Sequence, residues 1–105
     1  MLFIVTRFLP ATGMALFPFI LLKTKDLKAD ARIVNHERIH LRQQAEMLVI
    51  PFYVFYLLNY LFNLMKYGKH REAYRQIVFE REAYAKDGDG SYLTKRRPWA
   101  FVSYL

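Results

Sequence analysis

The stretch IVNHERIHLRQQAE, residues 33–46, holds two of the chain's three histidines, four residues apart, with a glutamate directly after the first. In an α-helix, residues i and i+4 lie one turn apart on one face, so the imidazoles of His36 and His40 can converge on a single cation. Glu37 lies beside that face, where it can reach a water ligand rather than the metal. The pattern predicts a helical zinc site with Glu37 as general base. The alternative is two exposed helix histidines with a solvated glutamate between them.

Residues on both sides of this stretch set the limits of the expected helix. Asp30 follows a polar segment and is a good N-cap, because its carboxylate can accept from the first free backbone N–H groups. Pro51 lacks a backbone donor, and its ring clashes with the carbonyl of Met47 in a continuous helix. The helix should therefore run to about Val49 and end or kink at the proline.

Two histidines leave such a site one protein ligand short. Catalytic zinc commonly takes His, His and Glu, with the fourth position left to water. Glu80, in FEREAY on a later expected helix, is the best third ligand, since the small Ala83 one turn on would let the two helices approach closely. The alternative for Glu80 is a surface helix glutamate near Arg81.

Other side chains are weaker candidates for the third ligand. Glu46 is rotated away from His40 on the same helix, and Asp87 and Asp89 belong to the turn-forming DGDG sequence at 87–90. The sequence also leaves open Glu72, Glu82 and His70.

HExxH followed downstream by ExxA resembles the gluzincin group of zinc metallopeptidases, in which the later glutamate is the third ligand. Nearly the whole chain is also similar to a group of short uncharacterised bacterial proteins that carry NHExIHLRQQ and FEREAYA. Gln43 is similar to the last residue of the HExxHxxQ form of some bacterial relatives. The resemblance implies a zincin-like minimal domain that binds Zn²⁺. The residues that match are His36, Glu37, His40, Glu80 and Ala83.

One position departs from the gluzincin pattern. The membrane-associated members usually have ExxAD, and Tyr84 stands where that aspartate would support the ligands from outside. Tyr84 or Tyr74 could instead donate a hydrogen bond to an oxyanion. Packing is the expected role of both tyrosines.

The rest of the chain predicts one mostly helical α+β domain over residues 1–105, with about three helices. Apolar runs at Leu2–Val5 and Leu16–Leu22 predict an N-terminal β-hairpin. Pro18 confines the second run to a sheet edge or a strand start, and an edge there could align an extended substrate. Residues 69–86 predict the third helix, which DGDG ends.

Residues 47–65, MLVIPFYVFYLLNYLFNLM, contain no charge and are long enough to cross a membrane. At 100° per residue, however, the aliphatic residues lie on one side and the Tyr and Asn residues on the other. This separation favours an aliphatic face in a core and a Tyr/Asn face toward polar groups or an interface. A straight crossing would also separate His36 and His40 from Glu80 by about 30 Å. We therefore expect a break near Pro51 and a segment packed on the protein or lying at an interface.

Composition limits the partners and the compartment. A net charge of +7 favours anionic surfaces, and the absence of cysteine excludes disulfides and thiolate ligands. Nucleic acid is not expected, because no recognition motif is present. The apolar N-terminal stretch lacks a basic start and is interrupted by Arg7 and Pro10, so no cleavable signal peptide is expected. A cytoplasmic and a membrane-associated location both stay open.

The expected function is zinc-dependent hydrolysis of a peptide bond in a peptide or protein substrate. The rival is a zinc-stabilised binding module without turnover, in peripheral contact with a membrane or part of a larger assembly. A chain of 105 residues leaves little wall for a substrate cleft, which favours the rival. The oligomeric state is not given by the sequence.

Overall fold

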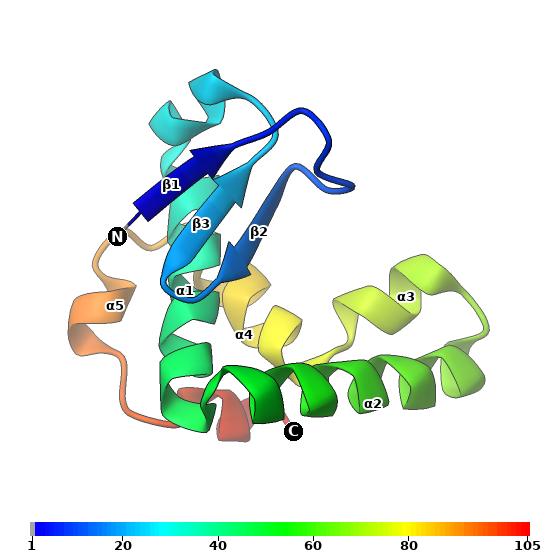
Figure 1. Ribbon diagram of the computed structural model, residues 1–105. Coiled ribbons are helices and arrows are strands. Elements are labelled where there is room, and N and C mark those ends of the chain that lie inside the picture. The colour runs from blue at the N-terminus through cyan, green and yellow to red at the C-terminus, as the bar shows by residue number, and fades with distance from the viewer. Residues whose placement is uncertain (1) are drawn as a thin grey trace.

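The computed structural model describes residues 2–105 and shows a small sheet packed on one long helix, with the other helices on that helix's far side and at its end (Figure 1). This is the mostly helical α+β fold that the sequence predicts. The elements are β1 (Leu2–Val5), β2 (Gly13–Leu16), β3 (Phe19–Leu22), the 3-10 helix η1 (Lys25–Ala29), α1 (Ala31–Met47), α2 (Val49–Tyr67), α3 (His70–Arg75), α4 (Val78–Lys86), α5 (Tyr92–Lys95) and the 3-10 helix η2 (Ala100–Tyr104).

The sheet has three strands in the order β1-β3-β2. β2 and β3 are antiparallel, and β1 pairs in parallel with β3. The expected hairpin of residues 2–5 with 16–22 is therefore wrong in its pairing as well as its limits. The hairpin is formed by β2 and β3, with Phe17 and Pro18 in the turn between them, and β2 begins at Gly13. Since Pro18 precedes β3 instead of lying within it, β3 has all the donors that a central strand needs. Ile20 and Leu22 of β3 are fully buried.

The first long helix begins where the sequence predicts. Asp30 Oδ1 accepts from the backbone N–H groups of Arg32 and Ile33 at 3.1 and 3.2 Å. The helix ends at Leu48, whose φ of 66° interrupts the helical path before α2 begins at Val49. Pro51 therefore lies in the first turn of α2, where its missing N–H would have no helical partner. The break expected near Pro51 is present.

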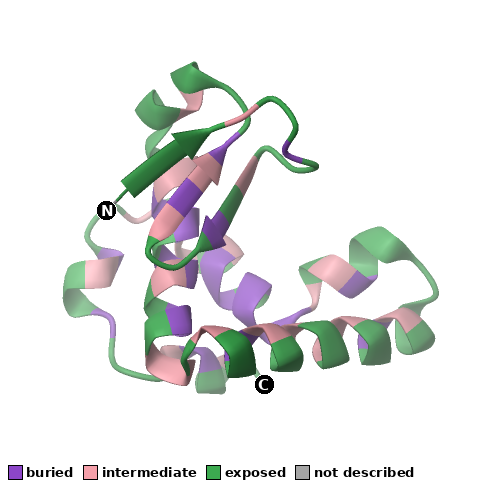
Figure 2. Ribbon diagram, in the orientation of Figure 1, coloured by how far each residue is buried: buried purple, intermediate pink, exposed green. Residues whose placement is uncertain are grey.

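The two sides of α2 have different outcomes. Its Tyr/Asn side contacts polar groups of the body, as expected. Its aliphatic side, expected in the core, is exposed (Figure 2). Asn59 Oδ1 accepts from the Val78 N–H at 2.8 Å, and Asn63 Nδ2 donates to the Ala73 carbonyl at 3.1 Å. The first N–H groups and last carbonyls of a helix have no partner within it. Amide side chains of α2 supply partners to α3 and α4, which aliphatic side chains could not do.

The helix expected over residues 69–86 is divided into α3 and α4. Ile77 has extended backbone angles, φ −61° and ψ 133°, and separates the two. The break lets Ile77, Val78 and Phe79 enter the main core cluster with Phe52 and Phe101. It also places the start of α4, with Glu80 in its first turn, against α1. α4 ends at Lys86, directly before DGDG, as predicted.

Candidate metal centre

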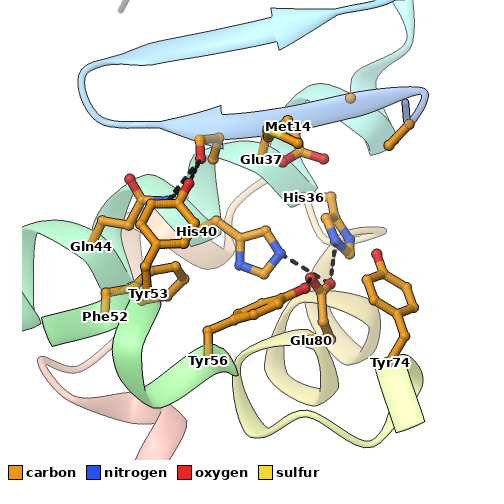
Figure 3. Close-up of a pocket in the computed structure, with 13 residues that line it drawn as sticks. Met14, His36, Glu37, His40, Gln44, Phe52, Tyr53, Tyr56, Tyr74 and Glu80 are labelled. Atoms are coloured by element: carbon orange, nitrogen blue, oxygen red, sulfur yellow. Dashed lines mark hydrogen bonds and ion pairs between the residues drawn. The ribbon is translucent and has the colours of Figure 1, made fainter. Parts of the chain in front are cut away.

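Three side chains from α1 and α4 converge beneath β2 (Figure 3). The Nε2 atoms of His36 and His40 lie 3.1 and 3.0 Å from the same oxygen, Glu80 Oε1. The three ligand atoms are all within 4.8 Å of one another, and the three residues are buried. Two imidazole nitrogens and one carboxylate oxygen form a donor set suited to zinc. This group could hold a metal ion, and it unites the three residues that the sequence selected as ligands.

The close approach of α1 and α4 depends on residues between the ligands. Ile39 of α1 and Ala83 of α4 are completely buried in a second, smaller core cluster. A methyl group at position 83 leaves room for the two helix backbones to come together. The small residue expected to bring Glu80 to the histidines therefore lies at the contact.

Glu80 and His40 shift each other's pKa in opposite directions. Burial alone would raise the pKa of Glu80, but the neighbouring imidazoles and the Tyr56 hydroxyl hold it well below its usual range. Burial would lower the pKa of His40, but attraction to Glu80, together with hydrogen bonds, raises it to about 9. In the metal-free protein His40 is therefore cationic and Glu80 anionic at neutral pH, and a metal ion must displace a proton to bind.

Asp87 supplies an outer carboxylate behind His36. Its Oδ2 lies 3.0 Å from His36 Nδ1, and its Oδ1 accepts from Arg32 Nη1 at 3.1 Å. Asn35 Nδ2 donates to the backbone carbonyls of Asp87 and Asp89, which ties the DGDG turn to α1. Because a carboxylate fixes the proton on Nδ1, the Nε2 lone pair is available to a metal. Tyr84 stands where the gluzincin pattern has an aspartate, but His36 still has a carboxylate partner in Asp87, three residues further along the chain.

Gln43 orients His40 in the same way. Its Nε2 donates to the Phe79 carbonyl at 3.1 Å and to Glu82 Oε1 at 2.9 Å, so its Oε1 must face His40 Nδ1, which is 2.8 Å away. Gln43 is completely buried. The amide therefore holds the proton on Nδ1 and leaves Nε2 directed at Glu80.

The support for Gln43 extends to the C-terminal segment. The side chains of Glu82 and Arg96 are fully buried and paired, and Arg96 Nη1 also reaches Glu46 Oε2 at 2.8 Å. Burial would raise the pKa of Glu82, but hydrogen bonds from Arg96, Tyr92 and Gln43 lower it below its usual value. Glu46 and Glu82, considered as ligands from sequence, belong to this network instead. Sequence reasoning missed the role of Arg96, whose signal was only a basic run.

The remaining candidates lie outside the ligand group. His70 Nδ1 is 2.8 Å from the Tyr60 hydroxyl, and Glu72 is exposed on α3. Asp89 pairs with Lys95 at 3.0 Å. None of these three belongs to the metal-binding group found within residues 2–105.

Glu37 lies beside the group and faces a cavity of about 170 Å³. Figure 3 shows its carboxylate on the β2 side of the histidines. A Cβ atom at Gly13 would lie 3.2 Å from Glu37 Oε2, so the glycine lets β2 pass close to this carboxylate. Within residues 2–105 no side chain or backbone group forms a hydrogen bond with it, so its oxygens are left accessible from the cavity. Burial raises the pKa of Glu37 despite the attraction of His40 and His36.

Tyrosines form part of the cavity wall. Tyr56 of α2 donates to Glu80 Oε2 at 2.6 Å, a contact that the sequence indicated only through the Tyr/Asn spacing of the helix. Tyr74 also lines the cavity, and its hydroxyl is 3.1 Å from that of Tyr84. The ring of Tyr84 packs edge-on against His36, with centroids 4.5 Å apart. Of the two tyrosines named from sequence, Tyr74 borders the cavity and Tyr84 packs behind it.

No protein-family model, curated protein or solved structure matches the chain. The likeness to gluzincins therefore rests on the motif residues alone, and function has to follow from the geometry around them.

Proposed function

We propose that the chain is a zinc-dependent hydrolase of peptide bonds, with Glu37 as its general base. The position of Glu37 carries this proposal. Its carboxylate lines the cavity beside the ligand group and forms no hydrogen bond among residues 2–105. Because no enclosed side-chain oxygen of these residues lacks a hydrogen-bond partner, the oxygens of Glu37 are accessible from the cavity. His36 and His40, by contrast, are each held by an outer partner. A structural metal site gains nothing from a partnerless carboxylate that opens into a cavity, whereas a hydrolase needs one to move a proton.

Each side chain of the site has a distinct task in this proposal. His36, His40 and Glu80 would hold Zn²⁺, which acts as a Lewis acid and lowers the pKa of water. Glu37 accepts the proton of the attacking water and passes it to the leaving amine. Its raised pKa supports this role, because a base is most effective when its pKa is near the working pH.

β2 is the strand that would align a substrate. It lies at the sheet edge and borders the cavity through Gly13, Met14 and Ala15, so the edge expected at residues 16–22 is moved to Gly13–Leu16. The Ala15 carbonyl accepts from Gln44 Nε2 at 2.9 Å and from the Tyr53 hydroxyl, which fixes β2 over α1 and α2. Because the Ala15 carbonyl is already occupied, an extended peptide would pair with this edge near Gly13, which lies beside Glu37.

Glu37→Gln tests the proposal, because amide and carboxylate have nearly the same shape. We expect the variant to keep the fold and bind zinc, while hydrolysis of a peptide library falls by on the order of 10²-fold or more. Glu72→Gln, at an exposed glutamate on α3, is the matched control and should retain full activity. Equal cleavage by the Glu37 variant would refute a role as base. So would a zinc-loaded wild type that cleaves neither peptides nor membrane proteins.

One observation favours the second candidate, a zinc-stabilised binding module without turnover. The cavity lined by all three ligand residues has a volume of about 170 Å³, below the roughly 300–1,000 Å³ of common ligand sites, although a second cavity of about 550 Å³ shares Gly13, His36, Glu37 and Tyr74 with it. This candidate predicts that zinc removal lowers the unfolding temperature and abolishes partner binding, while Glu37→Gln changes neither. Glu37→Gln therefore separates the two functions, because it removes activity in a hydrolase and changes neither stability nor partner binding in a binding module.

A further inference from the structure

The outward side of α2 is a continuous apolar surface. Six large apolar side chains lie within about 100° of the helix circumference, and we call them the outer face of α2. The exposed fractions run from 45% at Leu61 to 87% at Met65. Figure 2 shows this side of the helix as exposed along its length. The outer face of α2 consists of Ile50, Val54, Leu57, Leu58, Leu61 and Met65.

By length and composition α2 could cross a membrane, but its packing excludes a simple span. The helix has 19 residues. An 18-residue stretch of it has a mean hydropathy of 1.2, and only 11% of that stretch is buried. Its opposite side is bound to the body along its length, through Tyr56 to Glu80, Asn59 to Val78 and Asn63 to Ala73. A span would take these polar contacts through the hydrocarbon layer together with the helices that they hold. The geometry instead suits a helix lying in the membrane plane with one side immersed.

The charge of the surface identifies the kind of membrane. Fourteen of the sixteen Lys and Arg residues are exposed, whereas only three of the nine acidic residues are, namely Asp26, Asp30 and Glu72. The other acidic residues are partly or fully buried, several of them in the metal centre and the network around Arg96. The solvent therefore meets a surface more cationic than the net charge of +7 implies. Such a surface attracts anionic lipid head groups.

Exposed cations also follow the outer face directly. Lys66 lies in the last turn of α2, Lys69 is the N-cap of α3, and Arg71 lies in the first turn of α3. Basic residues that flank an apolar helix face are placed to contact lipid phosphates while the face enters the acyl boundary. A second copy of the chain is a poor occupant by comparison, because two such cationic surfaces repel each other.

We propose that the outer face of α2 lies in the interface of an anionic lipid bilayer, with the helix parallel to the membrane plane. The inference does not depend on zinc or on hydrolysis. It concerns a surface on the side of α2 away from Glu80, so the metal centre can fail as an enzyme while the membrane contact stands.

Vesicle flotation of the purified full chain tests the occupant. The wild type should float with vesicles of phosphatidylcholine and phosphatidylglycerol, bind pure phosphatidylcholine far less, and be released by raised salt. The double variant Leu57→Asn with Leu61→Asn should lower binding at least about tenfold. The control is Phe8→Asn, at a side chain that is 80% exposed but outside α2. Circular dichroism and zinc binding check that both variants are folded.

Three results would overturn the proposal. The wild type could fail to float with anionic vesicles, or both variants could bind as well as the wild type. Sedimentation could also show a dimer that the double variant dissociates, which would assign the outer face to a second copy of the chain.

Depth measurements distinguish a helix in the plane from a span. The chain has no cysteine, so single cysteines introduced at Ile50, Leu57 and Met65 can each carry an environment-sensitive dye. A helix in the plane puts all three dyes at one shallow depth, as reported by quenchers fixed at different levels of the bilayer. Arg38→Cys, on α1, should stay in water. A deep Leu57 dye between two shallow ends would show a span and refute the proposed orientation.

Discussion

Replacing Asp87 with asparagine removes the negative charge behind His36 and keeps the size of the side chain. Asp87 Oδ2 lies 3.0 Å from His36 Nδ1, and both groups are buried. A charge-assisted hydrogen bond of this kind contributes about 1.5–3 kcal/mol, and loss of an outer-shell partner typically costs 10- to 100-fold in metal affinity. The two figures agree, since 10- to 100-fold corresponds to about 1.4–2.7 kcal/mol. We therefore expect the zinc affinity of Asp87→Asn to fall by that factor.

Competition with a chelating zinc indicator at pH 7.5 measures this difference. The bond from Arg32 to Asp87 contributes little of it, because the Arg32 side chain is 69% exposed. Asp89→Asn is the matched control, as its carboxylate is two residues away and bonds only to Ser91 and Lys95. An affinity of Asp87→Asn within twofold of wild type, with the fold intact, would refute the assignment of Asp87 as the group that orients His36.

Four further predictions concern the ligands and their support. Glu80→Ala should lower zinc affinity on the order of 10²-fold or more in the same indicator assay, and an unchanged affinity would mean that another residue is the third ligand. Zinc must displace the proton of His40, whose pKa is about 9 in the metal-free site, so zinc affinity should rise about tenfold per pH unit up to that value and then level off. The same raised pKa stabilises the metal-free fold fully below about pH 6.5, and urea titrations should show this contribution lost as pH rises through about 9. Arg96→Met leaves Glu82 buried and unpaired and should lower the free energy of unfolding by about 3–5 kcal/mol, whereas adding Glu82→Leu should recover much of the loss in urea denaturation.

The ligand group was predictable from sequence because each of its members carries a local signal. His36 and His40 share a helix face through their spacing alone. On α4, Glu80 is followed one turn later by the small Ala83, which allows a close approach to α1. The start of α1 at Asp30 and the break before Pro51 follow from capping and from the missing proline donor. For the two histidines and the helix limits, the deciding interactions lie within about one helical turn, whereas the contact of Glu80 with the histidines is made across the packing of α1 on α4.

The roles of Asp87 and Arg96 were not predictable, because these residues act across long sequence separations. Asp87 has the composition of a turn residue, and only the packing of the DGDG turn against Asn35 carries it to His36. Arg96 looks like part of a solvated basic run until Glu82 and Glu46 are placed around it. Neither role has a periodic or spacing signal that a single sequence could reveal.

The exposure of the aliphatic side of α2 was not predicted, for a related reason. Periodicity separated its two faces correctly but did not state which one the protein covers. Burying the aliphatic side is the usual outcome, but here the ends of α3 and α4 need hydrogen-bond partners, and Asn59 and Asn63 supply them. The unpaired backbone groups at the ends of α3 and α4 therefore decide which side of α2 faces the body. The sequence of residues 47–65 alone contains no information about them.

The dependence of His40 on Gln43, Glu82 and Arg96 also bears on the order in which the chain is made. Synthesis is vectorial, so a ribosome releases the two histidines of α1 long before Glu80, Asp87 and Arg96. A nascent chain at that stage presents two imidazoles with no third ligand, no carboxylate behind His36, and a Gln43 that Glu82 does not yet orient. The complete donor set and its outer partners come together only after Arg96 has been made. A metal ion would therefore meet the full site only on a completed chain.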